Sequence, residues 1–304
     1  MTAVLLGGLV FLIATRGGAH AGATRVPSGP SGLAIGDGSV WVASSETGSV
    51  SRVDTRSHAV TATIHVGGVP IRTAFADGSA WVTISSRDEV ARIDPVANRV
   101  SSKVTVGDGP GAIATDNGSV WVANGRDDSI SRIDPDSNAV VASIAVGRRP
   151  SGLAVGFDAI WVANARDRTV SRIDPTTNSV VATIPVGRSP AAITTSEDSV
   201  WVANGRSRSV ARIDPASESV TATIGVGNRP LVLTAGDGAV WVANVEDNTV
   251  SRIDPATGHV GRTVAVGSDP SALVVTDGTL WVASDGDNEI TRVSTGPQTV
   301  EQQR

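Results

Sequence analysis

The sequence contains no cysteine and no tyrosine among its 304 residues. The absence of cysteine excludes a disulfide scaffold, a thiol nucleophile, a Cys-ligated zinc site and an iron–sulfur cluster. Lys103 is the only lysine, so a catalytic-lysine mechanism has a single candidate. The four histidines, His20, His58, His65 and His259, are too few and too scattered to suggest a multi-histidine metal centre.

Only one long apolar run is present, and it lies at the N-terminus, over Ala3–Ala14. A membrane-spanning helix needs roughly 17–25 such residues, so this run is too short for one. It suits a secretory signal, with Ala19-His20-Ala21 as a small-residue cleavage site. Because no positive segment precedes the run, the truncated remnant of a membrane anchor is the alternative. A buried segment is the third interpretation, disfavoured because a closed ring leaves no core for it. The first two interpretations place the protein outside the cytoplasm, as a secreted, periplasmic or surface-anchored chain. We assign residues 1–20 to this segment and 21–304 to one domain.

A fixed repeat of 40 residues runs through that domain. Seven tryptophans keep this spacing without insertion, and they are Trp41, Trp81, Trp121, Trp161, Trp201, Trp241 and Trp281. Proline from Pro30 to Pro270 and arginine from Arg52 to Arg292 follow the same register. Such a period indicates a solenoid, a propeller or an array.

The pattern inside one period decides between these architectures. Over residues 151–186, four short segments at 151–155, 160–164, 170–174 and 180–186 are rich in β-branched residues or alternate in polarity, with turn residues between them. No window has helical periodicity. Four antiparallel strands per repeat are typical of a propeller blade. The sequence therefore predicts an all-β, seven-bladed β-propeller with four antiparallel strands per blade and no helix after the N-terminal segment.

The repeated residues are interpreted as structural. We expect the tryptophans to be buried between blades, and the repeated arginine and aspartate to tie turns and neighbouring blades together. The two ends of the chain fall in phase with an outer strand. We therefore expect Ala21–Val26 or Thr299–Gln303 to complete the outermost strand of the closing blade.

The repeat resembles a known family. The stretches Trp161-Val-Ala-Asn164, Val170-Ser-Arg-Ile-Asp-Pro175 and Val180–Gly187 are similar to the YVTN-type repeat of YncE-like β-propellers, with Trp in place of the family Tyr. The resemblance covers residues 27 to about 300 and implies a seven-bladed, often exported propeller without a single shared activity. A weaker similarity runs to streptogramin-lyase and gluconolactonase-like propellers. These are metal-assisted enzymes, whose chemistry needs His and Glu or Asp converging on the central channel.

No motif in the sequence predicts catalysis. There is no helix for a phosphate-binding glycine loop to open, and no histidine recurs near an unrepeated serine. Asp285–Glu289 resembles part of a calcium loop, but it lacks the later Glu and the flanking helices. We therefore predict no catalytic residue, no metal site and no cofactor.

The arginines of three blades depart from the repeat. In a propeller, the loops between the second and third strands of each blade and the connections between blades open on one side, which we call the connecting-loop face. In blades 3 to 5 these loops carry Arg126, Arg148, Arg149, Arg166, Arg168, Arg188, Arg206, Arg208 and Arg229. The equivalent loops of the other blades carry mainly acids, namely Glu46, Asp88, Glu89, Asp108, Glu246, Asp247, Asp269, Asp285, Asp287 and Glu289. This sorting predicts a basic half-face that binds an anionic ligand or a protein partner, although ordinary solvated surface charge is the plainer interpretation.

Three functions follow from these observations. The first hypothesis is an exported, non-catalytic propeller, a monomer that binds its partner through the connecting-loop face and is not an enzyme. The second is a channel-centred, metal-assisted lyase or lactonase-like enzyme. Binding of single-stranded DNA is the third, weakened by the net charge of -5 and by the absence of loop aromatics on which bases could stack. We expect no membrane contact beyond the N-terminal segment.

Overall fold

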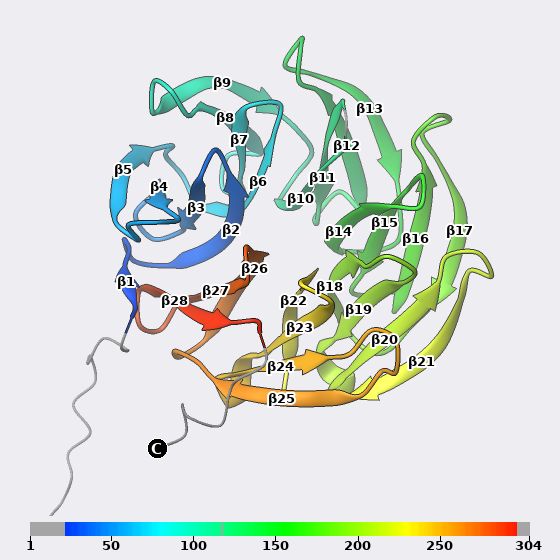
Figure 1. Cartoon of the computed structure of the whole chain (residues 1–304). Helices are drawn as coiled ribbons and strands as arrows, with labels where there is room; N and C mark the ends of the chain where they lie inside the picture. The colour runs from blue at the N-terminus through cyan, green and yellow to red at the C-terminus, as the bar shows by residue number, and fades with distance from the viewer. Residues whose placement is uncertain (1–21, 117, 297–304) are drawn as a thin grey trace, which may run out of the picture.

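The computed structural model describes residues 22–116 and 118–296, and these residues form seven four-stranded antiparallel sheets arranged in a ring (Figure 1). The seven sheets confirm the predicted fold. Because residues 1–21 lie outside the described part, the predicted signal or anchor does too. Among the described residues, none of the helical segments could span a lipid bilayer.

Each blade begins with an innermost strand beside the ring axis. These strands are β2 (Pro30–Gly36), β6 (Pro70–Ala76), β10 (Pro110–Asp116), β14 (Pro150–Gly156), β18 (Pro190–Thr195), β22 (Pro230–Gly236) and β26 (Pro270–Thr276). Neighbouring innermost strands contact one another all the way round, including β26 with β2. Each innermost strand begins with its repeated proline, and this end of the strand lies at the connecting-loop face.

The second and third strands form the body of each blade. The second strands are β3 (Ser39–Ser44), β7 (Ser79–Ile84), β11 (Ser119–Asn124), β15 (Ala159–Asn164), β19 (Val200–Asn204), β23 (Ala239–Asn244) and β27 (Thr279–Ser284). The third strands are β4 (Ser49–Asp54), β8 (Glu89–Asp94), β12 (Ser129–Asp134), β16 (Thr169–Asp174), β20 (Ser209–Asp214), β24 (Thr249–Ile253) and β28 (Glu289–Ser294). In blade 4 these bounds agree with the strands predicted from the repeat to within one residue.

The outer strands complete the blades, and one of them comes from the far end of the chain. They are β5 (Val60–His65), β9 (Arg99–Thr105), β13 (Ala139–Ala145), β17 (Ser179–Pro185), β21 (Ser219–Gly225), β25 (Val260–Ala265) and, in blade 7, β1 (Thr24–Arg25). Thr24 pairs with Ile290 and Arg25 with Glu289. The N-terminal alternative for ring closure is thereby confirmed, and Thr299–Gln303 lies outside the described residues.

The tryptophans form the packing between blades. All seven are buried, with at most 2% of their surface exposed. Trp41 of blade 1, for example, packs in one cluster with Val82 and Ile93 of blade 2, and its ring stacks on that of Phe75 at 6.1 Å. Burial of this kind stabilises a protein by several kcal/mol for each large side chain. The repeat therefore supplies the same packing contact at each junction between blades.

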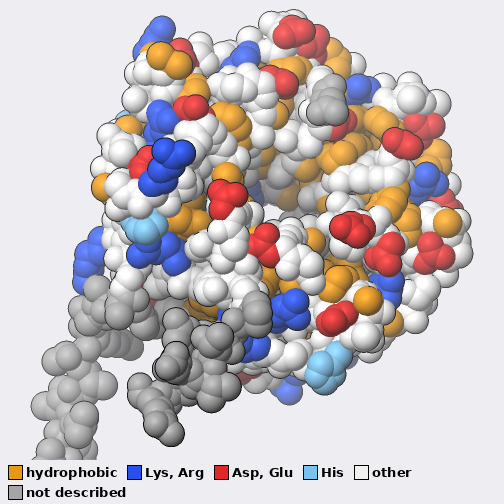
Figure 2. Space-filling view, viewed as in Figure 1, with side chains coloured by type: hydrophobic (Ala, Val, Ile, Leu, Met, Phe, Trp, Pro, Cys, Tyr) orange, Lys and Arg blue, Asp and Glu red, His pale blue; other side chains and the backbone are white. Residues whose placement is uncertain are grey.

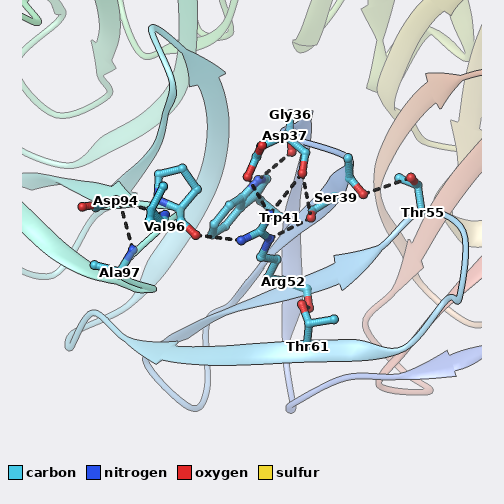
Figure 3. Close-up of polar contacts among 12 residues, drawn as sticks. Gly36, Asp37, Ser39, Trp41, Arg52, Thr55, Thr61, Asp94, Val96 and Ala97 are labelled. Carbon is cyan, nitrogen blue, oxygen red and sulfur yellow. Dashed lines mark hydrogen bonds and ion pairs between the residues drawn. The ribbon is translucent and has the colours of Figure 1, made fainter.

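In blades 1 to 4 the repeated arginine bonds to the next blade, as Figure 3 shows for blade 1. The Arg52 guanidinium lies over the Trp41 ring at 5.3 Å and donates to Asp37 at 2.6 Å and to the Pro95 carbonyl of blade 2 at 2.7 Å. Blade 6 differs, because Arg262 of the outer strand, rather than the repeated arginine, lies over the tryptophan ring. The expected tie between blades is thus present.

The repeated aspartate shapes the turn between the third and outer strands. In blade 1 the Asp54 carboxylate accepts hydrogen bonds from the backbone N–H groups of Arg56 and Ser57. These bonds hold the pKa of Asp54 below its usual value, chiefly through Ser57. The same lowering of the pKa by turn hydrogen bonds recurs at Asp94, Asp134, Asp174, Asp214 and Asp254. The repeated Asp is therefore a structural turn residue, and we look for functional residues in the loops.

Two short departures from the all-strand pattern lie on the connecting-loop face. Gly205–Ser207 (η1) and Val245–Asp247 (η2) form single turns of 3-10 helix in the loops between the second and third strands of blades 5 and 6. They are the helical segments in the described part of the chain. Both occur beside the arginines singled out in the sequence.

Candidate functional site

All nine sequence-predicted arginines are exposed and lie in loops of the connecting-loop face. Arg126 and Arg148 form ion pairs with Asp108 (3.1 Å) and Asp167 (2.6 Å). Within residues 22–116 and 118–296, the other seven form none. These seven guanidinium groups are therefore free to meet an anion from solution.

The structure gathers most of these arginines around a cavity at the mouth of the channel. The cavity has a volume of about 970 Å³. Five of the predicted arginines line it, and these are Arg149, Arg188, Arg206, Arg208 and Arg229. Ser151, Ala191 and Leu231, the second residues of β14, β18 and β22, also line it. We call this space the channel-mouth cavity. Residues of the variable loops of blades 4 to 6 and of the innermost strands therefore line the same space.

Arg72 also lines the channel-mouth cavity, although it belongs to β6 in blade 2. Among the described innermost strands it is the only basic residue, and the equivalent repeat positions hold Gly, Ala or Val. Arg72 was not among our predicted site residues, because we looked for unrepeated charge in the loops and not in the strands. The signal was present, since a large cation replaces a small residue in a single blade.

The surroundings of Arg72 hold its backbone and leave much of its guanidinium available. Its backbone N–H donates to the Thr83 hydroxyl at 3.1 Å, and that hydroxyl donates to the Gly111 carbonyl at 2.9 Å. Nη1 donates to the backbone carbonyls of Ser31 and Ile71. No carboxylate in the described residues pairs with Arg72, and burial lowers the pKa of its guanidinium. A half-buried cation without a counter-ion favours an anionic ligand.

Glu246 is the only acidic side chain among the described residues that line the channel-mouth cavity. It lies in η2, is exposed, and occupies the repeat position of Arg166 and Arg206. The next residue, Asp247, is engaged elsewhere, since its carboxylate accepts from the backbone and side-chain nitrogens of Asn228, both at 2.6 Å. Glu246 is therefore the available proton acceptor at this site.

The donor set of the cavity does not fit a divalent metal ion. Six arginines and one carboxylate line it, and this concentration of positive charge repels a cation. In the part of the chain that the structure describes, no three His, Cys, Asp or Glu side chains come together as metal ligands. His58 and His259 lie in turns of the opposite face, and His65 lies on the outer strand β5. The converging His and carboxylate ligands that a metal-assisted enzyme requires are not formed by the described residues.

The opposite side, which we call the turn face, has a different charge. It carries the turns between the first and second strands, and over blades 4 to 6 these expose Asp158, Glu197, Asp198 and Asp237. Figure 2 shows a face with acidic side chains over these blades and around a central hollow. The seven unpaired arginines of the predicted set thus lie on the face opposite these acidic turns.

Comparison with known proteins places these features in a family. The model of the virginiamycin B lyase family matches residues 19–223 and 63–303. No curated protein matches the sequence.

Similar solved structures share the fold. Virginiamycin B lyase from Staphylococcus aureus, in selenomethionine-substituted form, has a TM-score of 0.80 and 20% identity, with 90% of this chain and 97% of that chain covered. A streptogramin B lyase structure has a TM-score of 0.79 and 17% identity, with 89% and 95% covered. Hydrazine synthase from Kuenenia stuttgartiensis has a TM-score of 0.78 and 15% identity, with 94% and 99% covered.

The family match corrects two of our predictions. We predicted a non-catalytic binding scaffold and no enzyme, and both predictions are wrong, because the matching family is one of lyases. The error arose because we required histidines at the channel before accepting catalysis. The lyase alternative agrees better with the comparison, although the channel-mouth cavity lacks the metal ligands which that alternative implied. With matches that together span nearly the whole sequence, the chain belongs to the virginiamycin B lyase family.

Proposed function

We propose that this protein is a lyase whose active site is the channel-mouth cavity and whose substrate is an anion. The observation that carries the proposal is the convergence of Arg72, from the channel wall of blade 2, with Glu246 and five loop arginines around one cavity. The family match supports the class of reaction. The size of the cavity, about 970 Å³, suits a small-molecule substrate.

The side chains present can support an elimination. In such a reaction a base removes a proton from the carbon next to a carbonyl group, a double bond forms, and the bond to the leaving group breaks with its electron pair. Glu246 supplies the carboxylate that accepts the proton. Arg72 supplies a fixed positive charge for the negative charge that develops on the carbonyl oxygen. Thr83 positions Arg72 by accepting its backbone N–H.

The loop arginines bind the substrate in this proposal. Arg149, Arg188, Arg206, Arg208 and Arg229 surround the entrance to the cavity and attract an anion before it reaches the channel. Of the remaining predicted residues, Arg166 and Arg168 extend the positive surface beyond the cavity, whereas Arg126 and Arg148 are held in ion pairs outside it and take no part in binding. A small anionic substrate therefore takes the place of the protein partner that the sequence also allowed.

The proposal is tested by assaying the purified protein with virginiamycin B, a streptogramin B and a panel of small carboxylates and phosphate esters, in water labelled with heavy oxygen. A lyase splits its substrate without taking up the label, whereas a hydrolase incorporates it. Glu246→Gln should lower kcat by about 100-fold, and Arg72→Gln by a similar factor, about 100-fold. Failure to turn over any of these substrates, or uptake of the label, would refute the proposal.

Matched controls distinguish this site from general damage. Glu46 occupies the repeat position of Glu246 in blade 1 and is also exposed. Glu46→Gln removes the same charge from the equivalent loop of blade 1, which lies outside the cavity, and should leave kcat unchanged. Arg126→Gln does the same for an exposed arginine that lines neither this cavity nor its neighbour. Equal losses in the control and site variants would contradict the assignment.

Two further predictions from the sequence accompany the proposal. The YVTN-type character of the repeat rests on the Trp-Val-Ala-Asn stretches and the 40-residue period. The extracytoplasmic location rests on the apolar segment at residues 3–14. Fractionation of the native host, followed by N-terminal sequencing of the protein, tests whether residues 1–20 are removed or anchor the chain.

A further inference from the structure

A second cavity lies beside the channel-mouth cavity, at the junction of blades 4 and 5. Its volume is about 300 Å³, and it is lined by Arg149, Ala165, Arg166, Arg168, Arg188, Ser189 and Arg206. No acidic side chain of the described part lines it, and none of its five arginines forms an ion pair there. Five like charges around so small a space repel one another unless an anion neutralises them.

The loop before the third strand of each blade contains a position with left-handed backbone. The residues there are Gly48, Asp88, Asp128, Arg168, Arg208, Asn248 and Asn288, with φ between 50° and 63°. Glycine, asparagine and aspartate tolerate this conformation, whereas a long side chain is disfavoured in it. Arginine therefore occurs at this position against the backbone preference, and it does so in blades 4 and 5, whose loops line the second cavity.

In four blades the side chain at this position also accepts a hydrogen bond from a backbone N–H of the segment that leads into the next blade. A side-chain oxygen of Asp88, Asp128, Asn248 or Asn288 accepts a backbone N–H from Gly109, Arg149, Asp269 or Gly29, at 2.7–3.0 Å. Arg168 and Arg208 cannot accept a hydrogen bond. The corresponding N–H groups of Ser189 and Arg229 accordingly donate no hydrogen bond within the described residues.

The replacement of Asp or Asn by Arg thus makes three changes at the junction of blades 4 and 5. It removes an acceptor, adds a guanidinium group and frees the N–H of Ser189, which lines the cavity. Each change disfavours the folded loop and favours an anion. Because residues in strained conformations gather at functional sites, the loop is better explained by ligand binding than by folding.

We propose that the cavity at the junction of blades 4 and 5 binds a phosphoryl group. A phosphate monoester carries close to two negative charges and three strong acceptor oxygens, and guanidinium groups recognise it through paired hydrogen bonds. A carboxylate offers one charge and two oxygens, which is too little for five arginines together with a free N–H and the Ser189 hydroxyl. The chemistry of the lining therefore selects a phosphoryl group over a carboxylate.

This inference rests on the proposed function and specifies its substrate class. The two cavities are adjacent, because both are lined by Arg149, Ala165, Arg188, Ser189 and Arg206. A phosphoryl group held at the junction leaves the rest of its molecule in the channel-mouth cavity, where Arg72 and Glu246 lie. The substrate is then a phosphate ester, and the junction anchors it without taking part in bond cleavage.

Calorimetric titration of the full chain tests the inference, with inorganic phosphate, phenyl phosphate and benzoate as probes at low salt. We expect phenyl phosphate to bind most tightly, inorganic phosphate to bind about 10-fold more weakly, and benzoate to bind more weakly than either. If inorganic phosphate binds as well as phenyl phosphate, the site takes the free ion and the substrate assignment is wrong. Equal binding of benzoate and phenyl phosphate, or no saturable binding of phosphate, would overturn the phosphoryl site.

Arg168→Asn is the decisive variant. It introduces asparagine, which occupies the equivalent position as Asn248 and Asn288, so the loop should keep its fold. The change removes one guanidinium group and provides an acceptor for the Ser189 N–H. We expect it to weaken phenyl phosphate binding by about 10-fold or more and to bind benzoate as the wild type does. Arg126→Asn, on the same face but outside both cavities, should leave all three affinities unchanged. Wild-type phosphate binding in Arg168→Asn would refute the role of the junction.

The outcomes separate this inference from the proposed lyase activity. Phosphate binding at the junction without turnover of any substrate leaves the anion site in place and refutes the lyase. Turnover of unphosphorylated substrates, in a protein that binds no phosphate, supports the lyase and refutes the inference.

Discussion

Asn288 and Arg168 hold the same position of the repeat in blades 7 and 4, with nearly the same backbone φ of 55° and 59°. At the junction of blades 7 and 1, the Asn288 side chain accepts the backbone N–H of Gly29 at 3.0 Å and helps to close the ring. At the junction of blades 4 and 5, Arg168 leaves the equivalent N–H of Ser189 without a partner among the described residues. The same loop conformation therefore serves stability in one place and presents a positive charge in the other.

The comparison extends to the loops around each junction. Asp285 near the junction of blades 7 and 1 has a raised pKa, through partial burial and then the nearby carboxylates of Glu46 and Asp269. Asp167 beside the arginines has a lowered pKa, because it accepts hydrogen bonds from Arg148 and pairs with its guanidinium. The blades thus share one architecture, while their loops carry mainly positive charge in the sector around the junction of blades 4 and 5 and mainly negative charge in the sector around the junction of blades 7 and 1. Rigid frames with variable loops are a common way to build sites.

The largest effect should come from breaking the frame that both sectors share. Trp161→Ala in blade 4 and Trp41→Ala in blade 1 each remove a fully buried ring from between two blades. We expect each to lower the free energy of unfolding by about 3–5 kcal/mol, measured by denaturant titration. Similar losses in the two blades would show that the sectors differ in their loops and not in their cores. A loss confined to one of them would contradict the common frame.

A large effect on binding, without one on stability, should follow from reversing the charge of the arginine sector. Arg149, Arg168 and Arg208 are exposed, and none of them forms an ion pair within the described residues. Because exposed charges contribute only about 0–1 kcal/mol each to stability, the triple change to Glu should leave the melting temperature nearly unchanged. Affinity for phenyl phosphate should fall by about 100-fold or more at low salt and by less at high salt, where screening is greater.

The outcome contradicts the charged sector if the triple variant unfolds or if its affinity loss is independent of salt. Unfolding would mean that these arginines hold the loops together. A salt-independent loss would mean that shape, and not charge, governs binding.

A medium effect should follow from exchanging the two residues of the comparison. Arg168→Asn relieves a long side chain from left-handed backbone and restores a hydrogen bond, and it should stabilise the fold by about 1 kcal/mol. Asn288→Arg does the reverse at the seam where the ring closes, and it should destabilise the fold by about 1–2 kcal/mol. Thermal unfolding of both variants checks the signs. Stabilisation by Asn288→Arg would contradict our account of the loop.

The fold could be predicted from the sequence because the repeat makes every local pattern appear seven times. The strand pattern over 151–186 and the tryptophan spacing together define seven blades, and the phase of residues 21–26 and 299–303 predicts that one end of the chain completes the closing blade, without deciding which. Each depends on neighbouring residues or on the period, and both are visible in the sequence. The loop arginines were found in the same way, as departures from a regular background.

The centre of the site could not be predicted in this way. Arg72 reaches the loops of blades 4 to 6 only because the ring closes, so no local pattern pairs it with Glu246. The left-handed φ of Arg168 is likewise invisible in the sequence, although the glycine, aspartate and asparagine at its equivalents hint at it. Our prediction of a non-catalytic scaffold was wrong for a related reason, since we searched for histidines and overlooked a cation in a strand.

The smallest effect concerns pH and should have opposite signs in the two sectors. The folded pKa of Asp285 lies above its unfolded value, so this group favours folding at low pH and loses that contribution as the pH rises through the folded pKa. Asp285→Asn should therefore raise the melting temperature slightly at neutral pH, with the gain disappearing below about pH 4.

Asp167 has a folded pKa below its unfolded value, so its contribution is present at neutral pH and is lost as the pH falls. Asp167→Asn should lower the melting temperature at neutral pH, and the difference should vanish in acid. Both differences should shrink in high salt, because Asp285 is exposed and the half-buried Asp167 is still reached by solvent. If the two variants shift the melting temperature in the same direction, the carboxylates do not experience opposite electrostatic environments, and the division of the face into two charged sectors is wrong.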